Sequence, residues 1–210
     1  MRTAETIPGP SARSPASMGR IGPNAVVRLA EALTEVDASG VARGQVFEAA
    51  GLAHYLLAPP TEMVDERDVV ALHAALGQVL DERTAAAVAW RAGELTGDYL
   101  LAHRIPRAAR RLLAVLPAPL ASRALLSAIH RNAWTFAGSG GFSASPGHPV
   151  RLVITNSPLC KHAHERHPPC LYYAATFLCL FQALVSPRAR LARAACRHHA
   201  DGACTTEISW

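Results

Sequence analysis

The sequence has no apolar run long enough to cross a lipid bilayer. Its longest apolar segment, residues 171–185, contains Thr176 and Gln182 and is shorter than the roughly 18 to 20 residues that a spanning helix needs. The N-terminus lacks the long apolar stretch of a secretory signal, and five cysteines, an odd number, do not suit a disulfide framework. We therefore expect a cytoplasmic protein that does not span the membrane.

Several nucleotide-binding and catalytic motifs are missing as well. The glycine-rich segment 138–141 is no dinucleotide-binding fingerprint, because Ser143 stands where GxGxxG needs its last glycine and the segment leads to a predicted strand. The sequence has no Walker A motif, no GxSxG elbow and no cysteine run spaced for an iron–sulfur cluster. Aromatic residues do not alternate with basic ones, so nucleic acid is not an expected partner.

The composition is that of a globular protein. Half of the 210 residues are apolar and 18% are charged, and the net charge of +5 comes from twenty arginines and a single lysine. The one dense basic cluster holds Arg107, Arg110 and Arg111, which would share a helix face. A solvated helix face is the simpler interpretation, and contact with phosphate, a carboxylated ligand or an acidic partner is the alternative.

The apolar pattern changes along the chain. Residues 1–20 are rich in proline and serine and predict a disordered tail. Helical periodicity then predicts helices over 24–33, 42–57, from 65, 84–104 (with Thr84 as the cap), 107–115 and 118–131. Strands are predicted at 132–142 and 148–156, joined by a glycine-rich turn, followed by a loop over 157–169, a helix over 171–185 and a final hairpin.

This order predicts an α+β fold. A helical part, residues 21–131, would pack on an antiparallel sheet of order β-β-α-β-β in residues 132–210. We see no linker between the two parts and expect residues 21–210 to form a single composite domain.

The cysteines near the C-terminus have spacings that suit one metal site. Cys196 and Cys204 flank the turn signal Asp201-Gly202, so a hairpin would place them opposite each other with both thiols on one face. Cys170, just before an apolar helix, would supply a third sulfur. Zinc normally takes four ligands, so one is missing; ordinary buried thiols are the alternative interpretation.

Segments along nearly the whole chain after the tail resemble the bacteriochlorophyll 4-vinyl reductase family. The similar segments are RIGPNAVVRLAEAL (20–33), PPTEMVDERDVVALH (59–73), DYLLAHRIP (98–106), NAWTFAGSGGF (132–142), NSPLC (156–160), YYAATF (172–177) and ACRHHADGACTTEISW (195–210). The terminal C-x7-C hairpin is typical of a wider domain family that includes ligand-sensing modules.

The resemblance implies helices packed on an antiparallel sheet around a cavity for a small hydrophobic ligand. In sensor members, three cysteines and an acidic residue just before the second cysteine hold zinc. Cys170, Cys196 and Cys204 match the three cysteines, but residues 191–195 contain no Asp or Glu. The fourth ligand is therefore unidentified, with nearby histidines as candidates: His162, His164, His167, His198 and His199.

The family also implies reduction of the vinyl group of a divinyl magnesium tetrapyrrole, of protochlorophyllide type. Since no redox-cofactor motif is present, such a reductase would need an external electron donor such as NADPH. The alternative is a non-catalytic carrier that delivers the tetrapyrrole between pathway enzymes, with or without forming a homodimer, in the cytoplasm or at the photosynthetic membrane surface. Flat aromatic side chains suit a macrocycle, and the candidate pocket residues are Trp134, Phe136, Tyr172, Tyr173 and Phe177; core packing is their simpler role.

Overall fold

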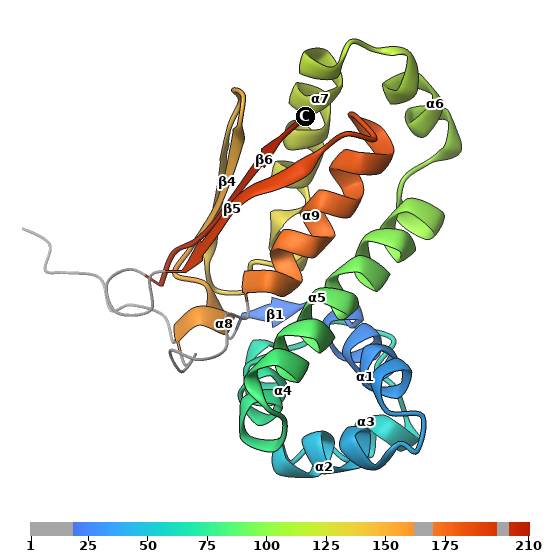
Figure 1. The fold of residues 1–210 in the computed structure, drawn as a ribbon, viewed down its shortest axis with the longest axis vertical. Helices are drawn as coiled ribbons and strands as arrows, with labels where there is room; N and C mark the ends of the chain where they lie inside the picture. Colours follow the sequence, from blue (N-terminus) through green and yellow to red (C-terminus); the bar gives the residue numbers. More distant parts are fainter. Residues whose placement is uncertain (1–18, 162–169, 197–201) are drawn as a thin grey trace, which may run out of the picture.

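The computed structural model describes residues 19–161, 170–196 and 202–210 (Figure 1). Apart from two strands of two residues each, helices come first, and the order β-β-α-β-β then follows, with the short α8 (Pro158–Lys161) before the long α9 (Cys170–Leu184). This confirms the predicted α+β class with an antiparallel sheet. The tail predicted for residues 1–20 lies almost wholly outside the described residues, and the single domain over 21–210 stays a prediction.

The helical part contains elements that pack at one end of the sheet and behind α9. They are α1 (Asn24–Val36), α2 (Val41–Ala49), α3 (His54–Leu57), α4 (Glu66–Val79), α5 (Glu82–Tyr99), a π-helical turn (Leu100–Arg104), α6 (Arg107–Val115) and α7 (Ala118–Arg131). Two short strands, β1 (Arg20–Ile21) and β2 (Val64–Asp65), pair antiparallel among them. The bounds of α6 and α7 are those that the sequence predicts.

Two predicted helix boundaries are wrong. Asp81, not Thr84, caps α5, because its carboxylate accepts a hydrogen bond from the backbone N–H of Thr84. The helix predicted over 42–57 is divided into α2 and α3, since Gly51 has a φ of 72°, in the left-handed region that ends helices.

The main sheet has the strand order β3-β4-β6-β5. Its strands are β3 (Gly141–Ser145), β4 (Val150–Thr155), β5 (Arg190–Cys196) and β6 (Cys204–Ser209). Alternate residues of β4 and β6 are buried, and this inner face is covered by α9 (Cys170–Leu184), which lies between the sheet and α5 (Figure 1). The outer face carries polar pairs such as Arg151 with Glu207.

The first predicted strand is placed wrongly. Residues 133–135 form a 3-10 turn, and the strand begins only at Gly141. The glycine-rich segment therefore precedes the hairpin instead of closing it, and residues 146–149 connect the strands. The reason is a long-range contact: the backbone N–H of Gly22 donates to the carbonyl of Thr135, which ties this turn to the start of the helical part.

Helices α5 and α9 approach each other closely because α5 carries two glycines at the contact. A Cβ on Gly93 would collide with the carbonyl oxygen of Tyr172, and a Cβ on Gly97 would lie 2.7 Å from the Sγ of Cys179. The hydroxyl of Thr176 donates across this contact to the carbonyl of Gly93, at 3.0 Å. The position of α9 is thus fixed on the side that faces the helices.

Candidate functional site

Four cysteines from four separate elements meet at one end of the sheet. Cys170 begins α9, Cys204 begins β6, Cys196 ends β5, and Cys160 lies in the short helix α8 (Pro158–Lys161). Their sulfur atoms all lie within 4.8 Å of one another. Cysteines up to 44 residues apart in the sequence therefore come together at one point of the fold.

The hairpin accounts for two of the four thiols. In the register of β5 and β6, Cys196 lies directly opposite Cys204, as the sequence predicts, and directly opposed residues point to the same face of a sheet. Cys204 is buried and Cys196 half-buried. The turn residues 197–201, including His198 and His199, lie outside the described residues.

Cys160 is the residue that the sequence analysis missed as the fourth member. The segment 157–169 is predicted as a loop, but its start forms α8 and buries Cys160 completely. The backbone N–H of Ser157 donates to the carbonyl of Gly202, which fixes α8 against the start of β6. The candidate ligands His162, His164 and His167 lie outside the described residues. The only sequence signal for Cys160 is its place among several residues of metal-ligand type.

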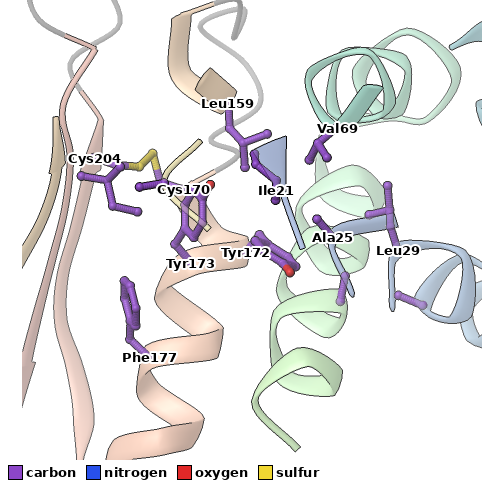
Figure 2. Close-up of a cluster of buried hydrophobic side chains, with 14 of the residues drawn as sticks. Ile21, Ala25, Leu29, Val69, Leu159, Cys170, Tyr172, Tyr173, Phe177 and Cys204 are labelled. Atoms are coloured by element: carbon purple, nitrogen blue, oxygen red, sulfur yellow. A yellow bond between two sulfur atoms is a disulfide. The ribbon is translucent and has the colours of Figure 1, made fainter. Parts of the chain in front are cut away.

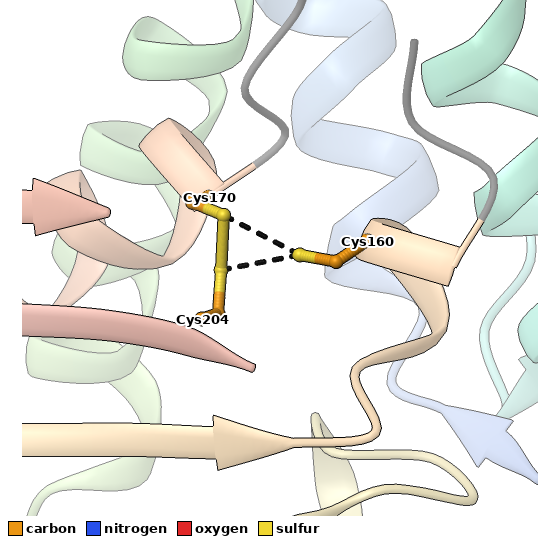
Figure 3. Close-up of a disulfide and its surroundings, with 3 residues drawn as sticks. All are labelled: Cys160, Cys170 and Cys204. Atoms are coloured by element: carbon orange, nitrogen blue, oxygen red, sulfur yellow. Dashed lines mark hydrogen bonds between the residues drawn. A yellow bond between two sulfur atoms is a disulfide. The ribbon is translucent and has the colours of Figure 1, made fainter. Parts of the chain in front are cut away.

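Two of the thiols are joined in the structure. The sulfurs of Cys170 and Cys204 form a disulfide with the Cα atoms 6.0 Å apart, and the Sγ of Cys160 lies 3.3 Å from each of them (Figure 3). This pair differs from the expectation of free thiols or metal ligands, because spacing in the sequence does not show which sulfurs come into contact. In the structure the cluster therefore contains one disulfide and two free thiols, those of Cys160 and Cys196.

The two free thiols have unlike acidities. Cys196 donates a hydrogen bond to Cys160, which lowers the pKa of Cys160, while the same bond and burial raise the pKa of Cys196. This hydrogen bond thus favours the thiolate form at Cys160 over the thiolate form at Cys196. Thiolate is the form of cysteine that binds metals.

The donor set suits a soft metal ion. Tetrahedral zinc with Zn–S bonds of about 2.3 Å places its sulfurs about 3.8 Å apart, and the four sulfurs here are all within 4.8 Å. Four cysteines without an open position are typical of structural zinc sites. Binding requires that Cys170 and Cys204 are reduced, since a disulfide sulfur is not a thiolate.

An aromatic cluster lies next to the cysteines, between β3 and the sheet-facing side of α9. Phe136 lies 5.4 Å from Phe142 and 5.8 Å from Phe177, between ring centroids, and Tyr173 stacks 6.5 Å from Phe177. The hydroxyl of Tyr173 donates to the carbonyl of Phe136 at 2.9 Å. We call Phe136, Phe142, Tyr173 and Phe177 the aromatic cluster.

Three of the five predicted pocket residues belong to this cluster, and two do not. Tyr172 points away from the sheet, toward Ala25 of α1 (Figure 2), because neighbours on a helix point about 100° apart. Trp134 is 65% exposed. Phe142 was not predicted, since alternation in a strand shows which residues share a face but not which helix covers it.

Tyr172 belongs to a separate buried polar group behind α9. Its hydroxyl lies 3.0 Å from that of Thr96, and the His73 ring meets its edge at 5.8 Å. Burial raises the pKa of Tyr172 to about 12 and lowers the pKa of His73 to about 4, so both side chains are neutral at pH 7. Among the described residues, the Nε2 atom of His73 has no hydrogen-bond partner.

Comparison with known proteins gives two relatives over nearly the whole chain. A protein of Cereibacter sphaeroides named bacteriochlorophyll synthase 23 kDa chain is 38% identical over 194 residues, which cover 92% of each chain. A protein of the same name from Rhodobacter capsulatus is 37% identical over 185 residues, 88% of this chain and 84% of that one. No family model and no solved structure matches the chain.

Proposed function

The chain belongs to the family of the bacteriochlorophyll synthase 23 kDa chains, and from this premise we propose that it acts in bacteriochlorophyll biosynthesis, where the vinyl group of a divinyl magnesium tetrapyrrole is reduced. The observation that carries the pathway assignment is the identity to both relatives over about nine-tenths of the chain. The assignment to vinyl reduction rests on the resemblance to the 4-vinyl reductases.

The part of this chain in that step is to bind the tetrapyrrole. The aromatic cluster on the sheet-facing side of α9 offers flat, apolar rings of the kind that stack on a macrocycle. Tyr173 adds a buried hydroxyl, already hydrogen-bonded to the backbone of Phe136. Conversion of the vinyl group to an ethyl group adds two electrons and two protons, so turnover requires a donor such as NADPH or a reducing partner protein.

The glycine-rich turn favours a second candidate function, that of a carrier without its own reductase activity. The side chain of Glu66 accepts hydrogen bonds from the backbone N–H of Ser139, at 2.6 Å, and from its hydroxyl, at 2.7 Å. A nucleotide phosphate would need free backbone N–H groups, and here the carboxylate of Glu66 already accepts from the backbone N–H of Ser139. This turn is thus no phosphate cradle, which favours binding and delivery of the intermediate.

We also propose that Cys160, Cys170, Cys196 and Cys204 hold a zinc ion once cellular thiols have reduced the Cys170–Cys204 pair. The cytoplasm keeps most thiols reduced, and four closed cysteine ligands give zinc a structural role. The ion would join α8, α9 and the β5–β6 hairpin at the end of the aromatic cluster, and so hold the wall of the proposed tetrapyrrole site in place.

The deciding experiment is anaerobic titration of the purified protein with divinyl protochlorophyllide. Binding is followed by the absorbance shift, and the product is analysed by chromatography with and without NADPH. We expect binding. Monovinyl product made by this protein with NADPH would establish the reductase, and binding without product would establish the carrier. Absence of binding would overturn both candidate functions.

A further inference from the structure

Helix α6 is the least buried long element of the described chain. None of its residues is buried, and Leu112 and Val115 are 60% and 78% exposed. Leu120, in the first turn of α7, is 48% exposed. Figure 1 shows α6 at the end of the molecule opposite α2 and α3, and apart from the main sheet. Exposed apolar side chains that gather at one end of a protein often indicate an interaction surface.

Helix α6 is amphipathic, and the rest of the fold covers only part of its apolar side. With about 100° between successive residues, Leu112, Leu113 and Val115 lie on one side of α6, and its arginines lie on the other. Leu113 packs against the core. Leu112 and Val115 point outward beside it, so this part of the apolar side is exposed to solvent.

The sequence in and around α6 is rich in positive charge. Between Asp98 and Glu165 the sequence has no acidic residue, but it has seven arginines and one lysine. Four of these arginines lie in or shortly before α6 (Arg104, Arg107, Arg110 and Arg111), and a fifth, Arg123, lies in α7. Within the described part of the chain, none of the five forms an ion pair.

We propose that residues 107–120 form a docking surface for an anionic phospholipid bilayer. A bilayer offers negative headgroups and, directly beneath them, an apolar layer, which matches arginines that flank exposed leucine and valine side chains. Long arginine side chains can keep their charge at headgroup level while the helix lies lower. A nucleic acid would satisfy only the arginines and would leave Leu112 and Val115 in water. We expect this docking to be peripheral. Among the described residues, no helix is long and apolar enough to cross a membrane.

The test is flotation of the full chain with vesicles of equal parts phosphatidylcholine and phosphatidylglycerol. We expect the protein to float with these vesicles at low salt, and to float weakly with pure phosphatidylcholine or at high salt. Replacement of Arg107, Arg110 and Arg111 by Gln should lower the partition coefficient roughly fivefold per arginine. The double variant Leu112→Ser with Val115→Ser should lose flotation.

The control is Leu57→Ser, which removes a 91% exposed leucine at the other end of the molecule and should float like the unmodified chain. Thermal unfolding verifies that each variant is folded, and because α6 buries no residue we expect little change. Unchanged flotation of the double variant, or equal flotation with neutral vesicles, would overturn the proposal. So would a dimer in vesicle-free buffer that the double variant abolishes, because a second copy would then cover this surface. No tetrapyrrole is present in this test, so its outcome is independent of the proposed function.

Discussion

The two sides of α9 are built differently. Toward α5 the contact is made by glycines and hydrogen bonds: Gly93 and Gly97 let the backbones approach, and Thr176 donates to the carbonyl of Gly93. Toward the sheet the contact is made by aromatic rings and thiols, with ring centroids about 5 to 6.5 Å apart. At Gly93 and Gly97 the helix-facing side leaves no room for an added methyl group. The sheet-facing side is held by side chains, which can change rotamer, and it is therefore the better place for a ligand.

The prediction with the largest expected effect removes a sulfur from the sheet-facing side of α9. Cys160→Ser should abolish stoichiometric zinc binding by protein purified under reducing conditions, and should lower the free energy of unfolding by several kcal/mol, because binding free energy of a structural metal is also folding free energy. Bound zinc is measured by elemental analysis and stability by urea unfolding.

Cys179→Ser is the matched control for that variant. Cys179 lies on the other side of α9, where its thiol is near Asp98, and its replacement should leave the zinc content unchanged. Full zinc content in Cys160→Ser would refute a four-cysteine site.

A second test concerns the polar group on the helix-facing side. Burial holds the pKa of His73 at about 4, below its value of about 6.5 in an unfolded chain. Between these values the unfolded chain binds a proton that the folded chain does not. The contribution of His73 to the free energy of unfolding is therefore fully present above about pH 6.5, and about 3 kcal/mol of it is lost as the pH decreases toward 4.

Urea unfolding at several pH values measures this slope. In His73→Phe the decrease in the free energy of unfolding between pH 6.5 and 4 should be smaller by the contribution of His73. In the control His130→Asn, which replaces an exposed histidine, this decrease should match that of the unmodified chain. An identical slope in His73→Phe and the unmodified chain would mean that His73 is accessible to protons in the folded protein.

The sequence predicts those features of α9 and its surroundings that depend on local pattern. The bounds of α6 and α7 follow from helical periodicity and flanking prolines. The position of Cys196 opposite Cys204 in the β5–β6 register follows from a turn signal between two short strands. The contribution of Cys160 could not be predicted, because it depends on contacts between α8 and β6, far apart in the chain. The same limit applies to Phe142, which was not predicted, and to Tyr172, which lies behind α9 and outside the aromatic cluster.

The smallest predicted effect on stability sharpens the contrast at the proposed ligand site itself. Phe177→Leu removes the ring that faces Phe136, Phe142 and Tyr173 but keeps an apolar side chain, so it should cost only about 1 kcal/mol of unfolding free energy. Phe177→Leu should also remove one aromatic contact with the macrocycle, worth about 1 kcal/mol, and so weaken binding of divinyl protochlorophyllide roughly fivefold in an absorbance titration. Trp134→Leu removes an exposed ring outside the cluster and should change neither quantity. If Trp134→Leu weakens binding and Phe177→Leu does not, the tetrapyrrole binds elsewhere, and the aromatic cluster is ordinary core packing.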